Sequence, residues 1–263
     1  FGLLFLILHF AFLIFIMSSP NFQQLFTSAL SDSSRVILEG FHAIKHAIRF
    51  DADVELIVAS ESSDFETLAT THAPDILDHL VTQTQKVLDA QFKTLTPTPP
   101  ETGIIAIAKK KSYSLDNILG NSAHIVLLDN PSHPGNVGAV IRVSAAAGCG
   151  GVLVHGTIDP WARAVVRGSA GLQFAVPVLQ LDDSHLDTLT TAGRTLIALD
   201  ERGEPLPSRL NLDGGEIIYL FGSERHGISP ELLARCDKTL AIPMQKGVSS
   251  LNLATSVAVV VYK

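Results

Sequence analysis

Continuous apolar runs of strand length recur through the second half of the chain, separated by glycine-rich turns and helical stretches. Such runs are typical of strands that are buried on both faces, as in a parallel sheet covered by helices. Between them lie helical patterns such as 137–147 and 162–169. The strands predicted in this way are 124–128, 151–155, 194–199 and 216–221. This alternation predicts an α/β fold with a mostly parallel sheet over residues 121–263.

The first half shows a smaller unit of the same class. Its predicted elements are a strand at 35–39, a helix at 41–50, a strand at 55–59, a helix at about 74–92 and a closing strand at 103–109. The helix at 74–92 is predicted because apolar residues recur there at three- and four-residue spacing. We therefore expect a small α/β domain over residues 17–110 and a polar linker at 111–120.

The two ends of the chain are apolar. Residues 1–16 carry no formal charge, and the first methionine is Met17. The stretch is shorter than the roughly 20 residues of a usual membrane span and lacks the positive leading region of a signal peptide. We expect Met17 to be the start and residues 1–16 to be a non-native extension, with a membrane anchor as the alternative. The chain stops inside an apolar run, so we expect its last helix to be cut short.

Composition supports a packed core. Hydrophobic residues make up 46% of the chain and charged residues 17%, which excludes wholesale disorder. Cys149 and Cys236 cannot form a disulfide framework and lack metal-ligand spacing. They predict a reducing setting and a cytoplasmic protein.

The net charge of −7 limits the partners. Residues 1–120 hold 8 Lys and Arg against 13 Asp and Glu, and the remainder holds 11 against 13. Nucleic-acid affinity draws on phosphate neutralisation, so a nucleic-acid surface on this chain must be a local basic patch.

Residues 129–154 form the first cluster in which chemistry is expected. Gly135 and Gly138 let the backbone approach a ligand or a neighbouring strand. Their three-residue spacing departs from G-x-G-x-x-G, and no acidic residue follows about 20 positions on, so a dinucleotide site and an oxidoreductase are disfavoured. Arg142 lies in an otherwise small and apolar helical run, where a charge is costly unless paired or functional. A structural ion pair and an active-site cation are equal alternatives for it.

Two further clusters follow predicted strands. In 219–229, Glu224 is either a cap of the next turn or a site carboxylate, and nothing distinguishes His226 as a base among ten histidines. In 242–261, Ser249 and Ser250 are explained as helix N-caps. Asn252 inside the first helical turn is harder to explain, because asparagine is a mediocre helix former.

The three clusters together resemble a known family. The segments PGNVGAVIR, LFGSERHGIS and IPMQKGVSSLNLA resemble motifs one, two and three of the SpoU (TrmH) family of RNA ribose 2′-O-methyltransferases, within the SPOUT superfamily. The resemblance covers about 121–263, includes 162–178, and is most specific in the third motif. The segment ILEGFHAIKHAI is similar to the entry of the small substrate-binding domain that often precedes this catalytic domain.

The resemblance implies a fold and a cofactor. The family's catalytic domain is an α/β fold with a deep C-terminal trefoil knot, and S-adenosylmethionine is held bent among the knot loops. The positions of this chain that match the cofactor contacts are Gly222, Ile242 and Leu251, where the glycine suits close backbone approach and the two apolar residues can flank adenine.

The resemblance also implies the reaction, in which a methyl group passes to a ribose 2′-hydroxyl of structured rRNA or tRNA. Arg142 matches the motif-one arginine, which we expect to steer the RNA phosphate and stabilise developing negative charge, with direct proton abstraction left open. Asn136, Glu224, Ser250 and Asn252 match the other polar site positions and are expected to orient Arg142 and the ribose. No metal is expected.

A homodimer is implied as well, with each site completed by the partner subunit. We expect dimerisation to gather basic residues such as Arg163 and Arg167 along one RNA path. The lysines at 109–111 are either a solvated loop or a further RNA contact. The overall acidity departs from the family pattern, and Gln245-Lys246 occupy a variable position. The alternative function is a non-catalytic RNA-binding or assembly protein with the same fold.

Overall fold

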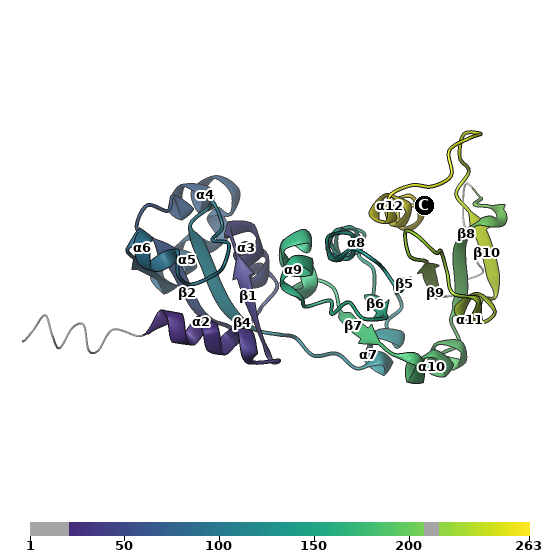
Figure 1. The fold of residues 1–263 in the computed structure, drawn as a ribbon, viewed down its shortest axis with the longest axis horizontal. Coiled ribbons are helices and arrows are strands. Elements are labelled where there is room, and N and C mark those ends of the chain that lie inside the picture. Colours follow the sequence, from purple (N-terminus) through teal and green to yellow (C-terminus); the bar gives the residue numbers. More distant parts are fainter. Residues whose placement is uncertain (1–20, 208–215) are drawn as a thin grey trace, which may run out of the picture.

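The computed structural model describes residues 21–207 and 216–263 and consists of two α/β lobes that lie end to end (Figure 1). The predicted extension at 1–16 lies outside the described residues. Among the helices that are described, none is both long enough and apolar enough to cross a membrane.

The N-terminal lobe holds a four-stranded sheet in the order β1-β4-β2-β3. Strand β4 runs antiparallel to β1 and β2, and β3 runs parallel to β2. The strands are β1 (Arg35–Glu39), β2 (Val54–Ser60), β3 (Thr84–Val87) and β4 (Ile104–Lys109). The helices are α2 (Phe22–Ser31), α3 (Phe41–Arg49), α4 (Phe65–His72), η1 (Pro74–Ile76), α5 (Leu77–Gln83) and α6 (Asp89–Phe92).

The predicted helix at 74–92 is wrong. Residues Thr84–Val87 form β3 and pair with Ile57–Ser60 of β2, so the helix is interrupted in its middle. Two of the apolar residues that suggested one helical face, Val81 and Leu88, are exposed. Spacing alone favoured a helix, and pairing with the free edge of β2 outweighed it.

The C-terminal lobe holds a six-stranded parallel sheet in the order β10-β8-β9-β5-β6-β7, which confirms the predicted architecture. The strands are β5 (Ile125–Asp129), β6 (Gly151–His155), β7 (Val178–Leu181), β8 (Thr195–Pro205), β9 (Ile217–Phe221) and β10 (Lys238–Ala241). The helices are α7 (Leu115–Leu119), α8 (Pro134–Ala146), α9 (Arg163–Ser169), η2 (Leu172–Phe174), η3 (Asp183–His185), α10 (Leu186–Thr191), α11 (Pro230–Leu233) and α12 (Leu253–Val261). The trefoil knot stays a prediction.

Helices cover both faces of this sheet. One face packs against α8, α9 and α12 in a single apolar core, and the other packs against α7, α10 and α11 in a second core. Because both faces are covered, every residue of β5, β6 and β9 is buried. Helix α7 lies within the stretch expected to be a linker. Its residues Leu115, Ile118 and Leu119 pack into the second core.

Helices α8 and α9 lie close together at a glycine. A side chain on Gly138 would stand 2.5 Å from the Val165 carbonyl oxygen and 2.8 Å from Cα of Gly168. Gly138 thus permits a close backbone approach, but the neighbour is helix α9 and not a strand. Gly135 faces open space at the start of α8.

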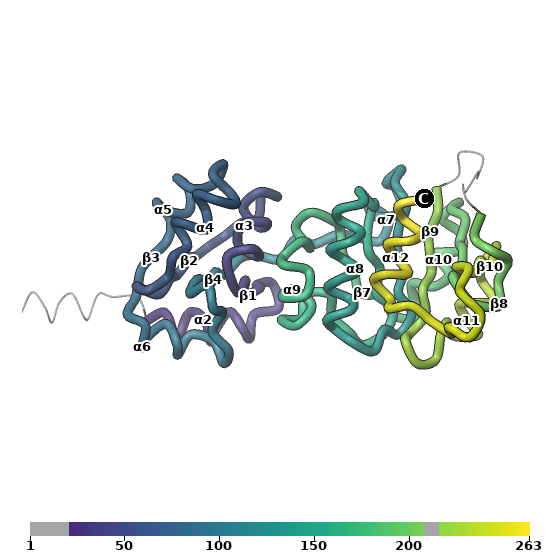
Figure 2. Tube along the Cα trace, turned by 90° about the horizontal axis from the view of Figure 1, so that it is seen from above, coloured from purple at the N-terminus to yellow at the C-terminus, as the bar shows by residue number. Residues whose placement is uncertain are grey.

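The two lobes share one apolar core and are also joined by polar contacts. Glu39 of β1 accepts hydrogen bonds from Arg163 and Arg167 of α9, and its side chain is 4% exposed. Lys111 donates to the carbonyl oxygens of Phe50 and Phe174, which belong to different lobes. Seen from above, α3, α9, α8 and α12 follow one another along the molecule (Figure 2).

These contacts involve cations that were considered for an RNA path. Arg163 and Arg167 share the single Glu39 carboxylate at the lobe junction, and their place on an RNA path stays a prediction. The lysines at 109–111 also have partners within the chain: Lys109 pairs with Asp53, Lys110 with Asp159, and Lys111 donates to the two carbonyls.

Candidate functional site

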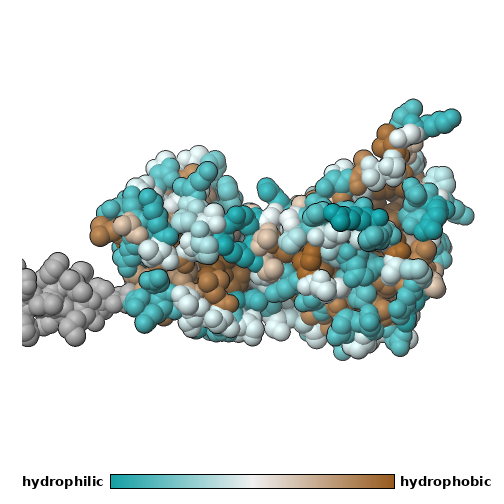
Figure 3. All heavy atoms as spheres, viewed as in Figure 1, coloured by the Kyte–Doolittle hydropathy of each residue, from teal (hydrophilic) through white to brown (hydrophobic). Residues whose placement is uncertain are grey.

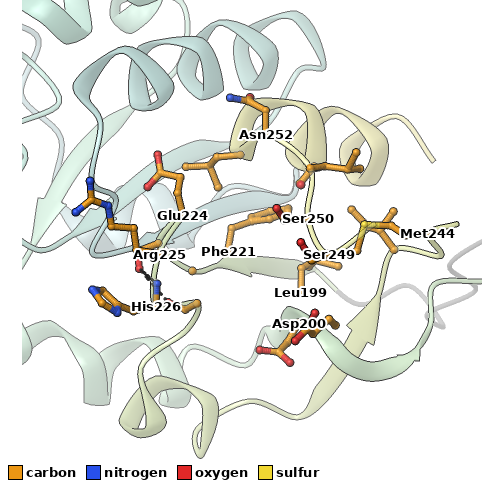
Figure 4. Close-up of a pocket in the computed structure, with 18 of the residues that line it drawn as sticks. Leu199, Asp200, Phe221, Glu224, Arg225, His226, Met244, Ser249, Ser250 and Asn252 are labelled. Carbon is orange, nitrogen blue, oxygen red and sulfur yellow. Dashed lines mark hydrogen bonds between the residues drawn. The ribbon is translucent and has the colours of Figure 1, made fainter. Parts of the chain in front are cut away.

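A cavity of about 790 Å³ opens at the carboxyl ends of β8 and β9 (Figure 4). This volume is within the range of ligand sites. Three chain segments line it, namely the end of β8, the loop after β9 and the segment that leads from β10 into α12. Its lining includes six of the residues expected at the site, which are Gly222, Glu224, Ile242, Ser250, Leu251 and Asn252.

The cavity has an apolar part and a polar part. Leu199, Phe221, Ile242, Met244 and Leu251 supply apolar surface from all three segments. Glu224, Asn252 and the serines supply hydrogen-bonding groups. An apolar pocket with a few placed polar groups suits a ligand that carries a flat ring at one end and polar groups elsewhere.

Gly222 closes the turn that follows β9. A side chain there would stand 2.1 Å from the carbonyl carbon of Gly227, and Ser223 and Gly227 exchange two backbone hydrogen bonds. The position is therefore restricted to glycine by the turn itself. The turn leaves Glu224, Arg225 and His226 exposed at the cavity.

Glu224 anchors a hydrogen-bond network at the cavity edge. One carboxylate oxygen accepts from Nδ2 of Asn136 at 2.6 Å, and the other accepts from the Ser132 backbone N–H at 2.9 Å. Burial tends to raise the pKa of Glu224, but these hydrogen bonds outweigh it and the pKa lies below its ordinary value. Glu224 thus binds two residues of another segment, Ser132 and Asn136, at the cavity edge.

Asn252 continues the network. Its Nδ2 donates to Oδ1 of Asn136 at 3.1 Å, while its Oδ1 accepts from the backbone N–H groups of Ala254 and Thr255. Asn252 is the N-cap of α12, so the expectation that it lies inside the first turn is wrong. Ser249 and Ser250 are not the caps; both are exposed and line the cavity.

Arg142 lies on the exposed side of α8. Within the described residues its side chain makes neither an ion pair nor a hydrogen bond, so a structural ion pair in this chain does not account for it. It lies six residues beyond Asn136 and therefore leaves the helix on another side, about 9 Å further along the axis. The polar network does not reach Arg142. Because Arg142 is exposed, its charge carries no cost of burial in this chain.

The charge of Arg142 acts on the N-terminal lobe. Its charge contributes to lowering the pKa of His42 and of Lys45, after the larger effect of burial on both. Both residues lie on α3. Basic residues of both lobes, Lys45 and Arg142, therefore contribute to one cationic surface.

A buried polar cluster at the ends of the neighbouring strands was missed by sequence reasoning. Asp129, 1% exposed, accepts from His155 at 3.0 Å and from the Ser229 backbone N–H at 2.6 Å. His155 also contacts Asp183 at 3.0 Å. Burial tends to lower the pKa of His155, but the two carboxylates raise it further, so the net shift is upward. The signal in the sequence that could have indicated this cluster is that Asp129 and His155 each end an apolar run.

Comparison with known proteins supports one family. A family model described as "SpoU rRNA Methylase family" matches residues 123–262. The chain is 30% identical over 174 residues to a 23S rRNA (uridine(2479)-2'-O)-methyltransferase of Streptomyces viridochromogenes, which covers 63% of this chain and 60% of that protein. It is 25% identical over 229 residues to the Bacillus subtilis 23S rRNA (guanosine(2553)-2'-O)-methyltransferase RlmP, covering 86% of each.

Solved structures share the whole fold. The SpoU methyltransferase AviRb from Streptomyces viridochromogenes, crystallised with AdoMet, superposes with a TM-score of 0.71 at 24% identity, covering 93% of this chain and 96% of that one. A crystal structure of an RNA 2'-O ribose methyltransferase gives 0.71 at 26% identity, covering 93% and 95%. Both lobes are therefore arranged as in these proteins.

Proposed function

The chain belongs to the SpoU rRNA methylase family, and from this premise we propose that it transfers a methyl group from S-adenosylmethionine to a ribose 2′-hydroxyl of rRNA or tRNA. The observation that carries the proposal is the convergence of the motif-two and motif-three segments on one cavity. The motif-one segment joins them through Asn136, which binds both Glu224 and Asn252.

The residues present fit the cofactor. Ile242 and Leu251, with Leu199 and Phe221, offer apolar surface to an adenine ring, and the cavity volume accommodates a molecule of this size. The backbone at Gly222 forms part of the same wall. When bound, the cofactor supplies an activated methyl group on a sulfonium.

The polar network positions the ribose. Glu224 is held ionised by Asn136 and by the Ser132 N–H, so its carboxylate keeps a fixed orientation at the cavity edge. Ser250 and Asn252 lie at the same edge and can hydrogen-bond to hydroxyl groups. Because methyl transfer requires mainly an in-line arrangement of the reacting atoms, such positioning is the principal contribution expected of these side chains.

Arg142 acts on the RNA, and we infer that it does so across a homodimer. It is exposed and lies outside the polar network of its own chain. A second copy that packs against this surface would bring Arg142 to the partner's site. There a permanently protonated guanidinium would bind the phosphate and stabilise negative charge on the ribose oxygen.

An acidic chain can still bind RNA if some of its cations are not paired with carboxylates. Arg163 and Arg167 share the single carboxylate of Glu39, whereas Lys45 and Arg142 form no ion pair with any residue in the described ranges. We infer that RNA phosphates lie along α3 and α8, near His42, Lys45 and Arg142. A cytoplasmic location, where this RNA is found, is part of the same proposal.

The test is methyl transfer from radiolabelled S-adenosylmethionine to unmodified rRNA and tRNA. The Arg142→Ala variant is expected to lose methylation while its affinity for S-adenosylhomocysteine, measured by calorimetry, stays unchanged, because Arg142 does not line the cavity. Undiminished methylation by this variant would reject the role of Arg142. Absence of cofactor binding by the wild-type protein would favour a non-catalytic RNA-binding or assembly role.

A further inference from the structure

One wall of the cavity is built by a bulge in β8. Strand β10 pairs Thr239 with Ala198 and its next residue, Leu240, with Glu204. Residues 199–203 of β8 therefore have no partner on β10 and leave that ladder. Four of these five residues line the cavity, from Leu199 to Arg202.

The bulge is fixed by a glycine at its end. A side chain on Gly203 would stand 2.6 Å from the carbonyl carbon of Thr239 and 2.7 Å from the Leu240 backbone, so only glycine lets β8 rejoin β10 here. Bulges next to sites re-aim side chains and are specific features of a fold. In this bulge the side chain that turns inward is Asp200, which is 10% exposed, whereas Arg202 is 69% exposed.

The Asp200 carboxylate is ionised and held in one orientation. Its Oδ1 accepts from the backbone N–H and the Nε of Arg202 at 3.0 and 2.8 Å, and its Oδ2 accepts from Nη2 at 2.9 Å. The side-chain hydrogen bond from Arg202 is the main reason that the pKa of Asp200 lies below its ordinary value.

One acceptor position of Asp200 remains open toward the cavity. A carboxylate offers about four lone-pair positions, and Arg202 fills three. The fourth is on Oδ2, which lies 4.0 Å from where a side chain on Gly227 would begin, across the cavity on the turn after β9. Figure 4 shows Asp200 beside Leu199, on the side of the cavity away from Asn252.

We propose that Asp200 accepts a hydrogen bond from the ribose hydroxyls of the S-adenosylmethionine bound in this cavity. This inference rests on the proposed function. Leu199, the apolar neighbour of Asp200, belongs to the lining that suits adenine, and the ribose is attached directly to that ring. Arg202 already balances the charge of Asp200, so the open position suits a neutral hydroxyl donor rather than the cationic methionine end. Carboxylates serve the same purpose toward ribose in other nucleotide sites.

Calorimetry with two ligands tests the assignment. S-adenosylhomocysteine and 5′-methylthioadenosine both carry the ribose, but only the first carries the amino-acid end. Asp200→Asn is expected to weaken both by the same factor of about ten, the loss typical of one hydrogen bond to a charged group. The matched control is Glu204→Gln, since Glu204 lies in the same strand but is exposed and outside the cavity lining, and both affinities should stay at the wild-type values.

A second variant separates the ribose contact from the shape of the bulge. Arg202→Gln removes the same ion pair but keeps the carboxylate, so it should bind both ligands within about threefold of wild type. A loss equal to that of Asp200→Asn would assign the effect to the bulge and overturn the proposal. Equal binding by Asp200→Asn and wild type, or a loss confined to S-adenosylhomocysteine, would also overturn it. If the wild-type protein bound neither ligand, the proposed function would fall first and this inference with it.

Discussion

Asn136 links Glu224 with Asn252, because its amide group donates a hydrogen bond to Glu224 and accepts one from Asn252. It does so from the first turn of α8, without lining the cavity itself. The residue is therefore a positioning residue that sets the distance between the loop after β9 and the start of α12.

The Asn136→Ala variant should lower kcat by about tenfold or more, since small misplacements of positioned groups have effects of this size. Its affinity for S-adenosylhomocysteine should stay unchanged, because the cavity lining is intact. Steady-state methylation assays and calorimetry measure the two quantities. Gln180→Ala, which removes an exposed amide bonded to the Gly156 carbonyl, is the control. A change in cofactor affinity with unchanged kcat would contradict the positioning role.

His155 makes stability depend on pH. Burial tends to lower its pKa, but Asp129 and Asp183 raise it more, so the folded protein holds the proton more tightly than the unfolded chain. The resulting stabilisation is fully present below the ordinary histidine pKa of about 6.5 and is lost as the pH rises through the raised value.

Urea unfolding between pH 5.5 and 9 measures this effect. The free energy of unfolding of wild type, relative to His155→Gln, is expected to fall as the pH rises across that window. His79→Gln, a change at an exposed histidine of the N-terminal lobe, should leave the profile of wild type unaltered. A difference between wild type and His155→Gln that does not vary with pH would show that His155 gains no proton affinity on folding.

At the scale of elements, the start of α12 depends on one cap. Asn252 accepts from two backbone N–H groups of the first turn, whereas Ser249 and Ser250 lie in the exposed loop before it. The side chain of Asn252 thereby serves both the helix and the site.

Asn252→Ala should lower the free energy of unfolding by about 1 kcal/mol, the usual effect of losing an N-cap. Ser250→Ala should change it by less than about 0.5 kcal/mol, as expected for an exposed residue without such a bond. Both values come from urea unfolding, and Ser250→Ala should still reduce methylation. An equal loss of stability in the two variants would contradict the assignment of the cap.

At the scale of the whole molecule, the buried Glu39 carboxylate fastens the two lobes. It receives hydrogen bonds from Arg163 and Arg167 across the junction, and its side chain is nearly inaccessible. Both arginines are partly exposed, which reduces the strength of these pairs.

Glu39→Gln should lower the free energy of unfolding by about 2 kcal/mol, because it leaves two cations without their carboxylate. Glu66→Gln breaks an exposed pair with Lys86 and should have an effect below about 0.5 kcal/mol. Denaturant unfolding of the two variants decides the matter. Equal effects would mean that the junction ion pairs add nothing beyond an ordinary surface pair.

The whole-molecule charge distribution predicts which lysines bind RNA. Lys45→Gln should weaken RNA binding several-fold and reduce the slope of log affinity against log salt by about 1, since one phosphate contact is lost. Lys109→Gln removes an equal charge that is already paired with Asp53 and should alter neither quantity. Filter binding at several salt concentrations measures both, and the reverse order would place the RNA path elsewhere. The space-filling view shows a dip in the upper outline of the molecule between the two lobes (Figure 3).

The sequence by itself determined the buried strands of the C-terminal sheet. Runs such as 151–155 and 217–221 are apolar throughout because both faces of a parallel strand are covered, and this leaves a strong local signal. The resemblance to the SpoU motifs also indicated Gly222, Ile242 and Leu251, and all three line the cavity.

Only the tertiary structure decided the features that depend on a partner distant in sequence. Residues 84–87 became a strand because the edge of β2 was available. Asp200 turns into the cavity because β8 bulges against β10. In each case the energy comes from a contact between segments that are far apart in the chain, and no local pattern encodes it.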